Sequence, residues 1–253
     1  MPSSVVAALR AAGCVFAEDE ARHLVEAADT PEQLDAMVER RVAGLPLEHI
    51  LGWAEFCGLR VAVDPGVFVP RRRTGFLVQE AVALGGTVVV DLCCGTAAVG
   101  AAIAAALGPV ELHAVEIDPA AIPCARHNVA AAGGHVYQGD LFTPLPDSLR
   151  GRVDLLVANA PYVPTDAIAT MPPEARDHEA RVALDGGADG LDVQRRVVAS
   201  APDWLAPRGH LLIETSRLQA PHTAEEFRRS GLRARIATSD ELDATVVIGF
   251  PDD

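Results

Sequence analysis

A short polar segment, Asn159-Ala160-Pro161-Tyr162, follows an apolar run at residues 153–158. The side-chain oxygen of Asn159 and the backbone carbonyl of Ala160 are hydrogen-bond acceptors. Two acceptors placed out of the plane of an amide can hold its N–H groups and keep electron density on the nitrogen, which is otherwise delocalised into the carbonyl. Tyr162 can stack on the planar group. We therefore expect Asn159, Pro161 and Tyr162 to be catalytic, and Asn159, Ala160, Pro161 and Tyr162 to bind a substrate NH2 group. The alternative is an ordinary turn that ends a strand.

A second candidate segment, Val88-Val89-Val90-Asp91-Leu92-Cys93-Cys94-Gly95-Thr96, lies upstream. A β-branched strand that ends in an acid and a glycine-bearing turn is typical of a nucleotide-cofactor loop. The loop differs from Gly-x-Gly-x-x-Gly, because Cys93 and Ala97 stand where the first and third glycines are expected. S-adenosylmethionine carries no phosphate, so a looser loop can serve it. We expect Asp91, Cys93, Gly95 and Thr96 to contact this cofactor.

Acidic residues also follow the next two predicted strands. Glu116 stands where it can accept two hydrogen bonds from the ribose of the cofactor, with Ile117 beside it. Asp118 is predicted to be the N-cap of a helix that opens at Pro119. Asp140 is placed to meet the adenine amino group, and Leu141 is placed to meet its faces. Asn159 completes the predicted set of cofactor contacts. Each acid could instead be a loop residue or a cap.

Strands alternate with helices over most of the chain, which predicts an α/β fold with a mostly parallel sheet covered on both faces. The predicted strands are 87–91, 111–116, 135–138, 153–158, 209–215, 233–237 and 244–249, and the predicted helices are 74–84, 97–107, 119–132, 189–201 and 220–230. No helix separates the final two strands, so the last one is expected to be antiparallel. Residues 1–44 read as helices, the third opening at Thr30-Pro31. A hairpin is expected at 56–63, with Gly58 at its turn.

Composition narrows the functional classes. The 253 residues are 49% hydrophobic and 22% charged, as is ordinary for a soluble globular protein. No apolar run approaches the ~20 residues of a membrane span, and the N-terminus lacks the pattern of a secretory signal, so a cytoplasmic location is expected. The formal net charge of −14 argues against stable nucleic-acid binding, and the run Arg71-Arg72-Arg73 is too short to reverse this. The five cysteines form no Cys-x-x-Cys and no His pair has metal-ligand spacing, so free thiols and no metal are expected.

From about Pro46 to its C-terminus the chain resembles the HemK/PrmC family of protein-(glutamine-N5) methyltransferases. The segments that carry the resemblance are 46–52, Phe56, Gly58-Leu59, 63–71, 91–96, 139–142, Asn159-Ala160-Pro161-Tyr162, 183–192 (Ala-Leu-Asp-Gly-Gly-Ala-Asp-Gly-Leu-Asp) and Leu212-Ile213-Glu214. The resemblance implies a class I S-adenosyl-L-methionine-dependent methyltransferase, Rossmann-like, with a seven-stranded sheet at 74–253. It also implies an N-terminal helical substrate-recognition domain at 1–45 and a β-hairpin linker at 46–73. The expected partner is a protein substrate that carries a glutamine, with the Gly-Gly-Gln motif of a peptide-chain release factor as the family's target.

The chain departs from the family pattern in three places. The family's Asn-Pro-Pro-Tyr is Asn159-Ala160-Pro161-Tyr162 here, and its Pro-Arg-Pro-Glu-Thr-Glu is Pro-Arg-Arg-Arg-Thr-Gly at 70–75. The cofactor loop lacks two of the usual glycines. These changes keep other readings open: a divergent paralogue with another protein target, an N6-adenine nucleic-acid methyltransferase, a small-molecule methyltransferase, or a non-catalytic protein that binds S-adenosylmethionine.

Overall fold

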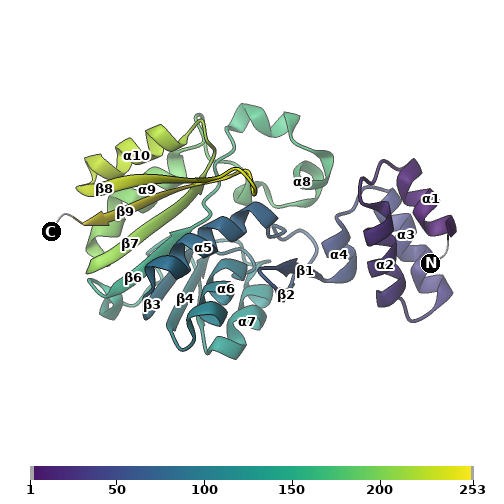
Figure 1. Cartoon of the computed structure of the whole chain (residues 1–253), viewed down its shortest axis with the longest axis horizontal. Coiled ribbons are helices and arrows are strands. Elements are labelled where there is room, and N and C mark those ends of the chain that lie inside the picture. Colours follow the sequence, from purple (N-terminus) through teal and green to yellow (C-terminus); the bar gives the residue numbers. More distant parts are fainter. Residues whose placement is uncertain (1–2, 252–253) are drawn as a thin grey trace.

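A seven-stranded sheet forms the centre of the molecule, and helices cover both of its faces (Figure 1). The computed structural model describes residues 3–251. The strands lie in the order β5-β4-β3-β6-β7-β9-β8. Their bounds are β3 Val88–Leu92, β4 Glu111–Glu116, β5 His135–Gln138, β6 Val153–Ala158, β7 Leu205–Thr215, β8 Leu232–Ser239 and β9 Ala244–Pro251. Strands β3 to β7 are parallel, and β9 is antiparallel to β7 and β8. The predicted mostly parallel sheet and antiparallel last strand are thus confirmed.

Alternate residues of the central strands belong to two apolar cores, one on each face of the sheet, because successive side chains of a strand point to opposite sides. One core joins Val89 and Leu155 to the helices α5 Gly75–Leu84, α6 Ala98–Leu107 and α7 Ile122–Val129. The other joins Val90 and Leu156 to α9 Asp192–Ser200 and α10 Ala220–Arg229. The carboxyl ends of β3, β4, β5 and β6 therefore meet at one edge of a rigid, doubly covered sheet. Ligands of open α/β sheets bind at such an edge.

Three N-terminal helices lie beside this body with an apolar core of their own (Figure 1). They are α1 Ser3–Ala11, α2 Ala17–Ala27 and α3 Pro31–Val42. The predicted start of the third helix at Thr30-Pro31 is confirmed, and the Thr30 side chain caps it by accepting a hydrogen bond from the Gln33 backbone N–H. Buried Arg41 joins Glu20 of α2 to Glu174 of the body that contains the sheet, with nitrogen–oxygen distances of 2.6 and 2.7 Å.

A short helix and a hairpin connect the N-terminal helices to the sheet. They comprise α4 Leu47–Leu51 and the antiparallel pair β1 Trp53–Phe56 and β2 Leu59–Ala62. Gly58 turns the hairpin with a φ of 77°, as predicted. The 3₁₀ helix η1 Arg72–Thr74 follows and leads into α5. The division of the chain into units at 1–45, 46–73 and 74–253 stays a prediction.

The segment between β6 and α9 had no predicted structure. It contains η4 Thr165–Thr170, α8 Pro173–His178 and η5 Arg181–Ala183, and the other short 3₁₀ helices are η2 Ala130–Ala132, η3 Asp147–Leu149 and η6 Ala201–Asp203. A parallel bridge between Val163 and Asp185 closes this segment into a loop at the edge of the sheet.

Two predicted helix starts are wrong. The Asp118 carboxylate accepts the Ala120 N–H at 2.9 Å and forms a turn, so α7 begins only at Ile122 and Asp118 is not its N-cap. The helix expected from residue 189 begins at Asp192, because Gly190 has a φ of 78° that interrupts a helix. Among residues 3–251, no helix has the length and the apolar character that a membrane crossing requires.

Candidate active site

A cavity of about 570 Å³ opens at the carboxyl ends of β3, β4, β5 and β6. Its size is that of a pocket for a small ligand. All of the predicted site residues line it: Asp91, Cys93, Gly95, Thr96, Glu116, Ile117, Asp140, Leu141, Asn159, Ala160, Pro161 and Tyr162. The loops that follow four separate strands thus meet at one cavity. The individual roles of these residues stay predictions.

The cofactor loop (residues 92–97) has glycine-like backbone angles at two positions where the expected glycines are absent. Cys93 and Ala97 have φ values of 53° and 56°, in the left-handed region where a side chain is strained by ~1–2 kcal/mol. The Cys94 N–H donates to the Val115 carbonyl at 3.1 Å and ties the loop to β4. Cys93 and Ala97 thus hold left-handed backbone angles of the kind that glycine adopts without strain.

Glu116 joins the ends of β3 and β4 through its carboxylate. One oxygen accepts the Gly95 N–H at 2.7 Å, and the other accepts the N–H groups of Ile117 and Asp118, each at 2.8 Å. Burial raises the pKa of this carboxyl, while the three backbone bonds favour the ionised form. Glu116 therefore shapes the loops around the predicted ribose position as well as lining it.

Asp91 is fully buried at the end of β3. Its carboxylate accepts the N–H of Gly100 in α6 at 2.8 Å. Burial raises its pKa to about 7, with the neighbouring Glu116 charge adding to the effect. Asp91 thus fixes the first turn of α6 against the strand that ends in the cofactor loop.

Asp140 is engaged by a residue that sequence reasoning missed. Its carboxylate accepts a hydrogen bond from Arg196 of α9 at 2.5 Å, and both residues line the cavity. Leu141 follows with a φ of 48° and is buried. Arg196 lies on a helix face that gives no sign in the sequence of facing the site.

The acceptor loop (Asn159–Tyr162) holds its two polar side chains against η1. The Asn159 side-chain NH2 donates to the Thr74 hydroxyl at 3.4 Å, and the Tyr162 hydroxyl accepts from Arg73 at 2.9 Å. Ala160 is almost fully buried. Burial raises the pKa of the Tyr162 hydroxyl, with the nearby Glu214 carboxyl adding to this, so the phenol stays protonated.

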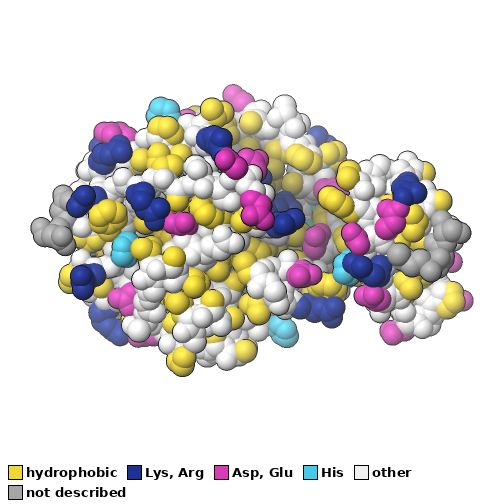
Figure 2. Space-filling model, in the orientation of Figure 1, with side chains coloured by type: hydrophobic (Ala, Val, Ile, Leu, Met, Phe, Trp, Pro, Cys, Tyr) yellow, Lys and Arg dark blue, Asp and Glu magenta, His cyan; other side chains and the backbone are white. Residues whose placement is uncertain are grey.

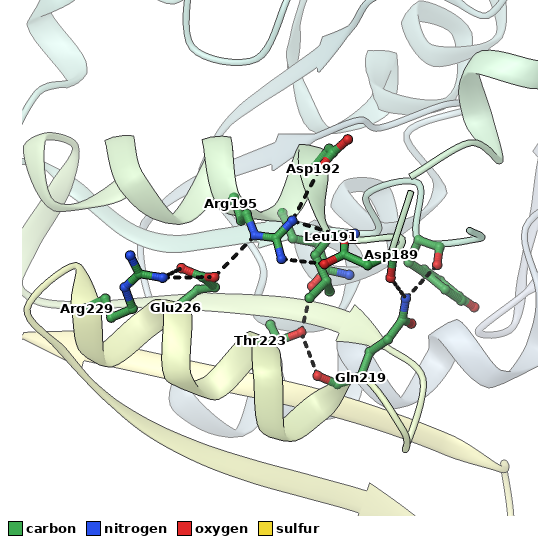
Figure 3. A network of polar contacts seen from close by, with 10 residues as sticks. Asp189, Leu191, Asp192, Arg195, Gln219, Thr223, Glu226 and Arg229 are labelled. Atoms are coloured by element: carbon green, nitrogen blue, oxygen red, sulfur yellow. Dashed lines mark hydrogen bonds and ion pairs between the residues drawn. The ribbon is translucent and has the colours of Figure 1, made fainter. Parts of the chain in front are cut away.

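The supporting segment (residues 184–192) explains why its glycines are needed. A Cβ on Gly186 would lie 2.7 Å from the carbonyl oxygens of both Pro161 and Gly190, and one on Gly190 would lie 2.3 Å from the Tyr162 carbonyl oxygen. The Gln219 side-chain NH2 donates to the carbonyls of Tyr162 and Asp189, at 2.9 and 3.0 Å. Figure 3 shows Gln219 and Asp189 within a polar network that extends through Arg195 to Glu226. The glycine-rich segment therefore packs directly on the backbone of the acceptor loop.

The basic run at 71–73 is part of the cavity wall rather than a wholly solvated loop. Arg71 pairs with buried Glu179 at 2.6 Å and lies over the Phe68 ring, while Arg73 contacts Tyr162. Arg72 is exposed. Figure 2 shows acidic and basic side chains interspersed over the face drawn, without an extended basic surface.

The sequence also led to expectations about the five cysteines and about metal binding. All five cysteines are free, as predicted, and burial raises the pKa of the Cys93 and Cys94 thiols, which disfavours reactive thiolates in the cofactor loop. Within the described range 3–251, no group of three His, Cys, Asp or Glu side chains could hold a metal ion.

The donor set fits S-adenosylmethionine. The Glu116 carboxylate lines the same cavity as apolar Val115, Ile117 and Leu141, a combination suited to a ribose and a base. Ile117 is 48% exposed, unusual for so apolar a side chain, and it lines the cavity where a flat ligand can cover it. The fold and the cavity together define a class I methyltransferase.

Comparison with known proteins supports the assignment to the methyltransferases. Residues 58–186 match the model of the methyltransferase small domain. A release factor glutamine methyltransferase of Geobacter sulfurreducens is 39% identical over 87% of this chain and 78% of its own length. A 4-amino-L-phenylalanine/4-methylamino-L-phenylalanine methyltransferase of Streptomyces pristinaespiralis is 35% identical over 81% of this chain and 73% of its own. The catalytic domain of human Mettl16 shares the fold, with a TM-score of 0.60 at 15% identity over 86% of this chain and 82% of that domain.

The chain belongs to the release factor glutamine methyltransferase family. It is a methyltransferase, and S-adenosylmethionine is its cofactor.

Proposed function

We propose that this enzyme methylates the side-chain amide nitrogen of a glutamine in a protein, and that a peptide-chain release factor is its substrate. The family membership supports this proposal, since relatives at 35–40% identity include several release factor glutamine methyltransferases. The observation that carries it is the position of the acceptor loop. Asn159 and Tyr162 line the same cavity as Glu116 and Gly95, so an amide held by the loop lies next to the predicted cofactor site.

In this proposal the chain contributes positioning and aimed dipoles. S-adenosylmethionine supplies an electrophilic methyl group when bound. The Asn159 side-chain oxygen and the Ala160 carbonyl accept the two N–H groups of the glutamine amide and keep electron density on its nitrogen. Tyr162 stacks on the amide plane. Ala160 can stand where the family has proline, because the acceptor belongs to the main chain.

The N-terminal helices are proposed to help recognise the protein substrate. Arg41 connects them to α8, in the segment between the acceptor loop and α9. That same segment carries Met171 and Val182, which line the cavity. A substrate that contacts α1–α3 would therefore approach the cavity at a defined angle. No stable nucleic-acid complex is expected, given the net charge of −14.

The test is transfer of label from S-adenosylmethionine to the release factors of the same organism, with the modified residue located by mass spectrometry. We expect one methyl group on the glutamine of the Gly-Gly-Gln motif. A matched substrate in which that glutamine is replaced by asparagine should lose most of the label, because a shorter side chain cannot reach the acceptor loop. Cofactor binding without label in any substrate would show a non-catalytic binding protein, and label only in nucleic acid would show an adenine methyltransferase.

A small aromatic amine is the second candidate substrate. The relative from Streptomyces pristinaespiralis that is named for 4-amino-L-phenylalanine supports it. The guanidinium of Arg73 at the cavity also supports it, because it could meet a carboxylate. Including 4-amino-L-phenylalanine in the same assay separates the two: faster methylation of the amine than of the release factor would select this alternative.

A further inference from the structure

The cavity wall beside the acceptor loop is built from two segments that are far apart in the sequence. The wall loop (residues 163–185) starts directly after Tyr162. The linker segment (residues 66–71) leads into η1, where Arg73 donates to the Tyr162 hydroxyl at 2.9 Å. Both segments contribute side chains that line the cavity, among them Phe68, Arg71, Met171 and Val182. The two segments therefore belong to the acceptor side of the cavity.

Glu179 is a buried carboxyl group that joins the two segments. Its side chain is 1% exposed, and it does not itself line the cavity. Both of its oxygens accept hydrogen bonds from the Arg71 guanidinium at 2.6 Å, and Oε1 also accepts the Val69 N–H at 3.2 Å. Next to it, the Ala180 N–H donates to the Gly66 carbonyl at 3.1 Å. The hydrogen bonds between the wall loop and the linker segment thus converge on Glu179 and its neighbour.

The linker segment depends on these contacts because residues 68–71 belong to no helix or strand. Val69 is buried, so its N–H needs an acceptor, and Glu179 supplies one. Arg71 in turn lies over the Phe68 ring, with 4.8 Å between the guanidinium carbon and the ring centroid. Glu179 therefore fixes the backbone of the segment directly and the Phe68 ring through Arg71.

The contacts of Glu179 suit a group that fixes an arrangement. Burial raises the pKa of this carboxyl, while Arg71 and the Val69 N–H lower it. Both oxygens accept hydrogen bonds, and only the ionised form can do so without presenting a hydrogen of its own. A buried ion pair adds little net stability compared with apolar side chains of similar size, whereas breaking it leaves a charge without its partner. The pair therefore allows one arrangement of the two segments and penalises others.

We propose that Glu179 is a positioning residue for the substrate that accepts the methyl group. By holding Val69 and Arg71 against the wall loop, it closes the cavity wall beside the acceptor loop and sets the space that the target side chain enters. Glu179 touches neither substrate nor cofactor and acts through Arg71 and Phe68. Its role rests on the proposed function, because the substrate is the ligand that enters beside the acceptor loop.

The first test is Glu179→Gln, in which an NH2 group replaces one acceptor oxygen. One oxygen suffices for Val69, so the NH2 group faces the Arg71 guanidinium and a charge-assisted hydrogen bond is lost. We expect KM for the release-factor substrate to rise about 10-fold, because the substrate binds only when the wall is closed. The value of kcat should change far less, since these contacts are the same before and during methyl transfer. Glu179→Leu removes both acceptors and should act more strongly in the same direction, which keeps the test valid if one variant folds poorly.

Glu80→Gln is the matched control, because it breaks an ion pair that does not line the cavity. Glu80 of α5 pairs with Arg235 of β8 at 2.8 Å. This variant should leave KM, kcat and the affinity for S-adenosylmethionine unchanged. Wild-type KM in both Glu179 variants would overturn the inference. A loss of cofactor affinity as large as the rise in KM would also overturn it, since general damage to the cavity affects both ligands.

A double-mutant cycle tests whether Glu179 acts through Arg71. Arg71→Met removes the guanidinium, so adding Glu179→Gln to it should raise KM little further. Independent, multiplying effects of the two substitutions would contradict a shared contact.

Hydrogen exchange measured by mass spectrometry gives a readout that does not depend on turnover. In Glu179→Leu, the amides of the linker segment and those of residues 171–184 should exchange faster together, by about 10-fold, because the open wall is more populated. The same peptides of Glu80→Gln should exchange at the wild-type rate. Unchanged exchange in either segment of Glu179→Leu would refute the proposal whatever the activity. If the wild-type enzyme does not methylate release factors, the proposed function fails, and the exchange measurement still decides whether Glu179 holds the wall.

Discussion

The cofactor loop and the acceptor loop both follow a parallel strand, yet they obtain their shapes in different ways. In the cofactor loop, Cys93 and Ala97 adopt glycine-like φ values, and the Glu116 carboxylate ties the turn to β4. In the acceptor loop, the backbone is packed from outside by Gly186 and Gly190, which leave no room for a Cβ. The cofactor loop requires left-handed backbone angles, which a residue with a side chain can still adopt under strain. The acceptor loop requires close packing by Gly186 and Gly190, which only a residue without a side chain allows.

The largest effect is expected from adding a methyl group to the supporting segment where it packs on the acceptor loop. Gly186→Ala would place a Cβ 2.7 Å from two backbone carbonyl oxygens. Because neither backbone can yield easily, unfolding free energy should fall by about 3 kcal/mol, and displacement of the acceptor loop should lower kcat/KM by roughly 100-fold. Chemical denaturation and steady-state kinetics measure both.

Gly75→Ala is the control, since its Cβ would meet only the flexible Cys57 side chain at 3.4 Å. It lies at the start of α5, where alanine favours the helix by up to about 1 kcal/mol. Equal effects of the two substitutions would show that the acceptor loop is not held by close packing.

A smaller effect is expected from removing the Glu116 carboxylate, which holds the cofactor loop against β4. Glu116→Ala loses a charged acceptor of three backbone N–H groups and the predicted ribose ligand. Cofactor affinity should fall by about 1.5–3 kcal/mol, measured by calorimetry. Cofactor affinity equal to that of the wild type would contradict the assignment of Glu116 as the ribose ligand.

The strain in the cofactor loop should appear as a difference between two alanine-to-glycine substitutions. Ala97→Gly relieves the left-handed conformation, whereas Ala102→Gly acts on a buried position inside α6. Both remove a buried methyl group, so the Ala97 variant should be more stable than the Ala102 variant by about 1–2 kcal/mol. Equal unfolding free energies would mean that Ala97 stores no strain.

A further effect depends on pH. The pKa of Asp91 is raised from its ordinary 3.8 to about 7, so the folded state holds a proton that the unfolded state has released between these values. Stability from this group is full below pH ~4 and is lost as the pH rises toward 7. Asp91→Asn keeps an acceptor for Gly100 and removes the titration. Its stability relative to the wild type, measured by urea unfolding, should increase from pH 5 to pH 8; a constant difference would contradict the raised pKa.

Much of the fold could be predicted because its signals are local. The strands β4, β5 and β6 begin and end at the predicted residues, since turn residues such as Gly and Pro lie close to both ends of each of them. The segment 159–191 could not be predicted, because its short helices have no apolar period and depend on contacts such as the bridge between Val163 and Asp185.

The candidate site, like the fold, could be predicted only in part. Residues at strand ends were found by position, but Arg73 and Arg196 reach the cavity only through tertiary structure.

The central claim is that the acceptor loop serves the chemical step and the cofactor loop serves binding. The most direct measurement compares Asn159→Ala with the wild-type enzyme in two quantities: kcat on the release-factor substrate and cofactor affinity by calorimetry. Removal of one dipole that acts as charge develops costs about 2.7–4 kcal/mol, so kcat should fall by ~100- to 1,000-fold while cofactor affinity changes far less. Retained kcat, or a loss of cofactor affinity as large as the loss of kcat, would contradict the account.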